Sequence, residues 1–145
     1  MNFLKPSFAK RVIFFLVSDA VLFTLSLYFA YQLRFDFDIP DLYFDRFWNV
    51  LAVLGILKIM LLAWFKIYNV SWRFFGLYDA KRVLKAHLLA LVGFGVLFYL
   101  FNDFFAPMPR SVILIDFFLS VLFVGILRIA KRMVLERTHQ SRTAL

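Results

Sequence analysis

The sequence predicts an all-α integral membrane protein, a bundle of four spanning helices. Of its 145 residues, 63% are hydrophobic and 18% are charged, and the mean hydropathy is +0.82. A soluble domain of this size needs a polar shell, so this composition indicates lipid as the solvent. Four apolar runs, each long enough to cross a bilayer, occupy most of the chain. The absence of cysteine excludes disulfides, thiolate metal sites and a catalytic thiol.

The first predicted helix covers residues 12–33 and contains one charge, Asp19. Its apolar stretch is longer than that of an ordinary cleaved signal peptide. Arg34, Phe35 and Asp36 follow it, so no small-residue cleavage site is present. We therefore expect this segment to be retained as a spanning helix.

The other three apolar runs predict helices over 47–65, 83–101 and 111–130. Four spans return both termini to the same side of the membrane. We expect residues 1–136 to form the membrane domain and 137–145 to form a polar linker toward a cytoplasmic catalytic domain.

The distribution of the 17 Lys and Arg residues predicts which side carries the termini. One side has only Arg34, Arg46 and Arg110, and Lys58 lies within a span. By the positive-inside rule, the more basic side is cytoplasmic, which gives an N-in, C-in protein of the bacterial inner membrane. The basic residues assigned to the cytoplasmic side are Lys5, Lys10, Arg11, Lys66, Arg73, Lys81, Arg82, Lys85, Arg128, Lys131, Arg132, Arg137 and Arg142.

The connection between the second and third helices is more apolar than a loop requires. We expect residues 67–78 to lie in the membrane interface, with aromatic side chains such as Trp72 toward the lipid and Arg73 toward anionic headgroups. Asp79 is well placed to cap the third helix just after Gly76.

Charges inside a membrane are costly, so Asp19, Lys58 and Asp116 are the first candidate site residues. Asp19 and Lys58 are predicted at matching depths on neighbouring antiparallel helices, about 11 and 12 Å from the cytoplasmic side. A structural ion pair between them is favoured over a proton or ligand relay. Asp116 is predicted nearer the external side, within reach of a hydrated external vestibule or of Arg34 and Arg110.

Two further ionisable residues are expected to have structural rather than functional roles. Arg128 is expected to extend its side chain to the cytoplasmic headgroups. His87, one turn into the third helix, is expected to be a hydrogen-bonded packing residue. Small residues at helical spacing predict close helix contacts, namely Ser26 with Ala30, and Ala86 with Ala90 and Gly93.

No catalytic or cofactor motif is found in the sequence. Gly93 and Gly95 form a GxG, but Phe98 stands where a third glycine would be. No Walker sequence, HExxH, GxSxG or cluster of acids with metal-ligand spacing occurs. The basic residues lie between apolar runs rather than on a polar face, which excludes a nucleic-acid-binding protein. We expect this chain by itself to hold no cofactor.

Three segments together carry a resemblance to a known family. They read FFLVSDAVLFTLSLYFAYQLRFDFDIP, then FKIYNVSWRFFGLYDAKRV, then FFAPMPRSVILIDFFLSVLFVGILRIAKRM. This order resembles the N-terminal membrane domain of bacterial membrane-bound nucleotide-sugar dehydratases, especially the UDP-N-acetylglucosamine 4,6-dehydratases of epsilonproteobacterial protein N-glycosylation (Pgl). The resemblance covers the chain from about Lys10 to Met133.

The resemblance implies a membrane anchor and oligomerisation domain for a lyase that makes 4-keto-6-deoxy sugars for bacillosamine-type glycans. In that family, NAD(P) binds in cytoplasmic Rossmann-type domains, for which this chain has no matching positions. The implied partners are the bilayer, the protein's own catalytic domain, a second copy of the chain and other enzymes of glycosylation. Two alternatives stay open: the membrane domain of a polyprenyl-phosphate sugar-phosphate transferase, and a free-standing small flippase or multidrug-type transporter.

Overall fold

The computed structural model describes residues 7–70 and 75–143, and this part of the chain is helical with short connections and no strand. A backbone without strands satisfies its own hydrogen bonds within each helix, which suits a chain whose surroundings are apolar. In chain order the elements are α1 (Phe8–Arg34), α2 (Asp41–Phe44), α3 (Phe47–Trp64), η1 (Ile67–Asn69), α4 (Leu77–Leu100), α5 (Asn102–Phe105) and α6 (Arg110–Thr143).

Within residues 7–70 and 75–143, four helical segments are long and apolar enough to cross a membrane. Large apolar side chains cover their outward faces, as a surface in contact with lipid tails requires. The fold is therefore that of a multi-pass helical membrane protein, as the composition predicts. The four segments are Phe8–Arg34, Asp41–Trp64, Leu77–Leu100 and Arg110–Thr138.

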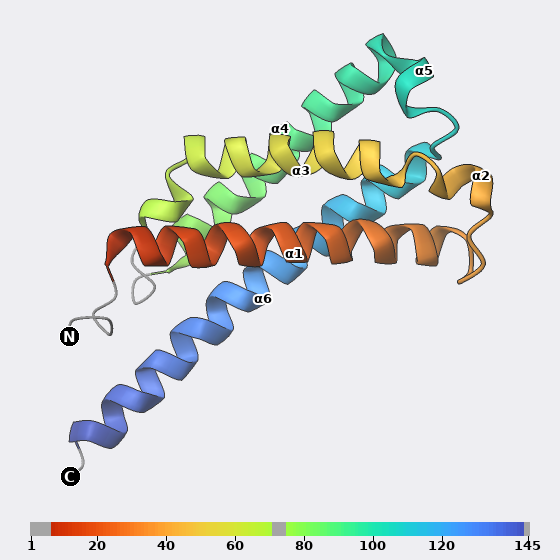
Figure 1. Ribbon diagram of the computed structural model, residues 1–145. Helices are drawn as coiled ribbons and strands as arrows, with labels where there is room; N and C mark the ends of the chain where they lie inside the picture. Colours follow the sequence, from red (N-terminus) through yellow and green to blue (C-terminus); the bar gives the residue numbers. More distant parts are fainter. Residues whose placement is uncertain (1–6, 71–74, 144–145) are drawn as a thin grey trace.

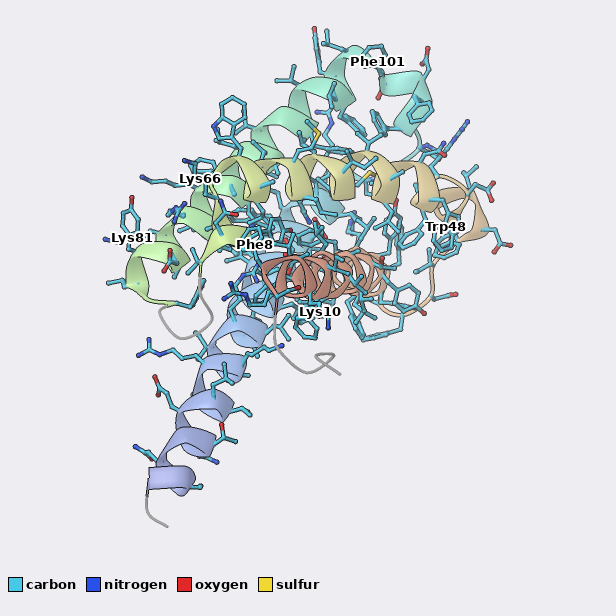
Figure 2. The ribbon with its side chains drawn as sticks, turned by 60° about the vertical axis from the view of Figure 1, so that its left-hand side comes forward. Phe8, Lys10, Trp48, Lys66, Lys81 and Phe101 are labelled. Atoms are coloured by element: carbon cyan, nitrogen blue, oxygen red, sulfur yellow. The ribbon has the colours of Figure 1, made fainter. Side chains whose placement is uncertain are left out.

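The helices alternate in direction, so α1 begins and α6 ends at the same end of the bundle (Figure 1). We call this end the η1 end, and the opposite end, where α2 and α5 lie, the α5 end. Figure 1 shows α3 beside α1, α6 crossing α1, and α4 tilting away from α1 toward α5. In Figure 2, Lys66 and Lys81 lie on the opposite side of the molecule from Trp48 and Phe101.

The helices begin and end near the predicted positions, with two differences. The third predicted helix begins at Leu77 rather than 83, because the Asp79 carboxylate accepts a hydrogen bond from the Gly76 amide at 3.2 Å and so caps an additional turn. The cap itself is as predicted. The fourth helix continues to Thr143, so residues 137–143 of the predicted polar linker are helical.

Two apolar clusters fill the interior of the bundle. The cluster at the α5 end includes Leu27, Leu54 and Phe94, and the cluster at the η1 end includes Phe23 and Leu62. Small residues permit close helix contacts, as predicted: Ser26, Ala30, Ala86 and Ala90 are buried, and Gly93 packs against Leu57.

Candidate functional site

Polar side chains gather in the interior where an apolar core would be expected. We call this set the polar core, and it draws on η1 and on all four long helices. Each member is almost completely shielded by the protein, so each depends on protein partners for its hydrogen bonds. The members of the polar core are Asp19, Ser26, Lys58, Tyr68, His87, Asp116 and Arg128.

The first ion pair of the polar core joins α1 to α6. The Arg128 Nη2 atom lies 2.9 Å from Oδ2 of Asp19, which is 0% exposed. The Tyr68 hydroxyl donates a second hydrogen bond to the same carboxylate oxygen at 2.8 Å. The guanidinium of Arg128 also lies over the ring of Phe15, 4.5 Å from its centre. Asp19 thus ties η1 and α6 to α1.

The second ion pair joins α3 to α6. The Lys58 Nζ atom lies 2.5 Å from Oδ2 of Asp116, and both side chains are buried. The Ser26 hydroxyl donates to the other carboxylate oxygen at 2.7 Å, which brings α1 into the same contact. The ammonium of Lys58 also lies 5.0 Å from the centre of the Phe23 ring.

His87 completes the polar core from α4. Its Nδ1 atom lies 2.9 Å from the Val83 carbonyl oxygen, and because a carbonyl only accepts, Nδ1 carries the proton. The ring packs edge-on against Phe23, with centroids 5.7 Å apart. Nε2 has no hydrogen-bond partner among the described residues. His87 is thus the buried, hydrogen-bonded packing residue that the sequence predicts.

The spacing of residues on α6 explains how one helix serves both pairs. Asp116, Ser120, Val124 and Arg128 are all buried and recur every four residues. Positions four apart lie near one another on a helix surface, and from this stripe Asp116 reaches Lys58 on α3 and Arg128 reaches Asp19 on α1. Asp116 and Arg128 are separated by twelve residues, or about 18 Å of helix rise. The two ion pairs therefore occupy two levels of the bundle.

The predicted ion pair between Asp19 and Lys58 is wrong, because each residue has a different partner. Lys58 binds Asp116 and Asp19 binds Arg128. The two residues lie at similar predicted depths on neighbouring helices, but depth does not determine which way each side chain faces. Asp19 faces α6, which packs closely against α1.

Two other predicted environments also require correction. Asp116 pairs with Lys58 and not with Arg34 or Arg110. Arg128 is 4% exposed and turns inward to Asp19, rather than reaching along the surface to headgroups. An inward guanidinium is favoured here because it finds a carboxylate and two aromatic rings, those of Phe15 and Tyr68.

Tyr68 and Ser26 are functional partners that the sequence did not single out as such. The sequence places Tyr68 in the interface segment and predicts a helix-packing role for Ser26. Ser26 lies seven residues after Asp19, on the same face of the helix. A serine placed in this way relative to an intramembrane carboxylate is a usable sequence signal for a polar interior. No sequence signal identifies Tyr68, because η1 is a short turn whose position depends on tertiary packing.

Trp72 and Arg73, the predicted interface residues, lie outside the described residues. Of the rest of the 67–78 segment, Ile67, Tyr68 and Phe75 are buried within the bundle. The expected placement of all aromatic residues toward lipid therefore fails for Tyr68 and Phe75. Leu77 and Tyr78 are strongly exposed and begin α4.

The electrostatics of the polar core are balanced. Two carboxylates face two cations, so their formal charges cancel within the bundle. At the η1 end, burial and the Asp19 carboxylate raise the pKa of the Tyr68 hydroxyl above its ordinary value. Tyr68 therefore remains a neutral hydrogen-bond donor at physiological pH.

The contacts of the polar core are suited to a structural role, in which they hold the helices in one relative position. The described residues include no group of three or more His, Cys, Asp or Glu side chains that could hold a metal ion. Both carboxylates are neutralised by a cation and receive a further hydroxyl hydrogen bond. Four segments from distant parts of the sequence are thereby held in register.

Comparison with known proteins gives no match to a family model, to a curated protein or to a solved structure.

Proposed function

We propose that this chain is the membrane anchor of a cytoplasmic nucleotide-sugar enzyme, of the UDP-N-acetylglucosamine 4,6-dehydratase type. In this proposal both termini face the cytoplasm of a bacterial cell and the bundle lies in the inner membrane. The anchor keeps the enzyme near the membrane steps of glycan synthesis that consume its product. NAD(P) binds in the catalytic part of that enzyme and not in this bundle.

The mutual pairing of the buried charges is the observation that carries the anchor role. A transporter needs a charge that exchanges its partner for a substrate or a proton during the cycle. Here Lys58 and Asp116 bind each other, as do Asp19 and Arg128, and one oxygen of each carboxylate also accepts a hydrogen bond from a hydroxyl. Such contacts favour a bundle that holds one conformation over a carrier that alternates between two.

The extension of α6 supports the same role. Arg110–Thr143 is one continuous helix, and its last part lies beyond the body of the bundle at the η1 end (Figure 1). Arg132 joins this part to the segment just before α4 by donating a 2.8 Å hydrogen bond to the Phe75 carbonyl. A helix fixed in this way is a stiff support for a domain held near the membrane surface.

The test is to join the coding sequence of this chain to whatever follows it in the genome and to express the whole product. The proposal predicts NAD(P)-dependent conversion of UDP-N-acetylglucosamine to a 4-keto-6-deoxy sugar in the membrane fraction. Activity of a polyprenyl-phosphate sugar-phosphate transferase would favour the second anchor alternative. Substrate or proton flux in liposomes that contain only this chain would favour the transporter.

A binding measurement on the purified chain tests whether the bundle itself binds the cofactor of the enzyme that it would anchor. The chain should not bind NAD(P) saturably in detergent, because it lacks a glycine-rich loop that could hold a pyrophosphate. Saturable binding, measured by equilibrium dialysis with a heat-unfolded sample as control, would contradict this part of the proposal.

A further inference from the structure

A groove of about 630 Å³ lies between α4, α5 and α6, at the α5 end of the bundle. This volume is in the range of sites that hold small molecules. Leu91, Phe98, Ile113 and Leu114 supply apolar walls, and Asn102 and Arg110 supply polar groups. The groove is separate from the polar core, because it shares no residue with it.

The polar and apolar groups of the groove are ordered along the helices. Leu91 lies eleven residues before Asn102, so the apolar wall of α4 extends well toward the middle of the span. Arg110 is the first residue of α6, and Leu114 follows it one turn deeper. The groove thus has a polar end near the membrane surface and an apolar length inside the membrane.

The groove opens on a face that meets the bilayer. Tyr99 is 83% exposed and Leu114 is 53% exposed, and both belong to candidate spans. Gly95 also lines the groove, and a Cβ atom at this position would meet nothing within 4 Å. The missing side chain leaves room in the wall at the depth where lipid tails lie.

Among the described residues, Arg110 is the only cation that lines this groove, and it forms no ion pair with any of them. A guanidinium at headgroup depth is well suited to a phosphate, which it can bind through two hydrogen bonds. Asn102 adds an amide group at the same level.

We propose that this groove binds one phospholipid with a zwitterionic headgroup, of the phosphatidylethanolamine class. One acyl chain lies along the apolar walls and the phosphate binds Arg110. The zwitterionic class is favoured because acidic residues outnumber basic ones at this end, so a net negative headgroup is repelled and an ammonium group is attracted. The described charged residues at this end are Arg34, Asp36, Asp38, Asp41, Asp45, Arg46, Asp103 and Arg110.

The proposal is tested by native mass spectrometry of the delipidated chain. Phosphatidylethanolamine or phosphatidylglycerol with identical acyl chains is added back, and the amount of bound lipid is measured. Gly95→Leu places an apolar side chain in the groove, and its Cβ atom would meet nothing within 4 Å. It should weaken phosphatidylethanolamine binding about tenfold or more. Gly55→Leu is the matched control, because its Cβ also enters open space but on α3, away from the groove. This control should bind lipid like the unchanged chain.

Arg110→Gln tests the headgroup contact separately, and we expect about a tenfold loss with an unchanged thermal midpoint. Equal lipid binding by Gly95→Leu and the unchanged chain would overturn the proposal. Preferential binding of phosphatidylglycerol would overturn the choice of a zwitterionic lipid. If Gly95→Leu instead dissociated a dimer without changing lipid binding, a second copy of the chain would be the occupant and the lipid site would be refuted.

Discussion

At the residue scale, the main feature is that each buried charge has a specific partner on another helix. An isolated charge at the centre of a spanning helix costs about 2.5–3.5 kcal/mol on insertion scales. This cost is reduced because the charges are paired, Lys58 with Asp116 and Asp19 with Arg128. Removal of one partner leaves the other buried and alone, whereas removal of both leaves no orphan charge.

Double-mutant cycles should therefore give strong coupling within each observed pair. Lys58→Met or Asp116→Leu alone should lower the free energy of unfolding by about 3–5 kcal/mol, and the double variant should be milder. Asp19→Leu combined with Lys58→Met should be close to additive, because these residues are not partners. The measurement is reversible unfolding in detergent, and strong coupling between Asp19 and Lys58 would refute the pairing described here.

The hydroxyl of Tyr68 provides a second prediction at this scale. Tyr68→Phe removes its hydrogen bond to Asp19 and should cost about 1.5–3 kcal/mol of unfolding free energy, since the acceptor is charged. Tyr28→Phe is a control, because that hydroxyl accepts a hydrogen bond from Gln32 at an exposed site.

The raised pKa of Tyr68 adds a pH dependence with a defined sign. An unfolded tyrosine ionises near pH 10, whereas the folded side chain retains its proton to higher pH. Its stabilising contribution is thus fully present below about pH 10 and is lost as the pH rises above that value. The difference in stability between the unchanged chain and Tyr68→Phe should narrow from pH 9 to pH 11. A constant difference would contradict the assignment.

At the scale of elements, the start of α4 is held by side-chain contacts to its neighbours. Asp79 caps the helix at Gly76 and forms an ion pair with Arg82 at 3.2 Å. Arg82 also donates to the carbonyl oxygen of Phe65, at the end of α3. These contacts determine where α4 begins and how it meets α3.

Asp79→Ala should destabilise the first turn of α4 by about 1 kcal/mol, through loss of the cap and of a favourable charge at the helix N-terminus. Hydrogen exchange should then be faster in residues 77–82. Glu136→Ala is the control, because it breaks an exposed pair with Arg132 that is worth about 0.5 kcal/mol or less. Unchanged exchange at the start of α4 in Asp79→Ala would show that the cap contributes little.

The long helices could be predicted from sequence, because uninterrupted apolar runs are a strong signal for spanning helices. The position of η1 could not, since Ile67 and Tyr68 are drawn into the interior by tertiary contacts. The charged members of the polar core were also found from sequence, as lone charges within apolar runs. Their pairing was not, because it depends on the rotation of α1 and α6 about their axes.

At the scale of the whole molecule, the proposed anchor depends on its orientation in the membrane. The η1 end carries many of the basic residues, among them Lys66 and Lys81 (Figure 2). The α5 end is acidic. The positive-inside rule then favours a cytoplasmic η1 end, which is the side where nucleotide sugars are used.

Thiol labelling of single cysteines tests this central claim most directly, because the natural chain has none. Asp41→Cys lies on α2 at the α5 end, and Arg137→Cys lies on the extension of α6. In intact cells, a membrane-impermeant maleimide should label the cysteine at position 41, and should label the one at 137 only after permeabilisation. Labelling of position 137 but not 41 in intact cells would contradict the account.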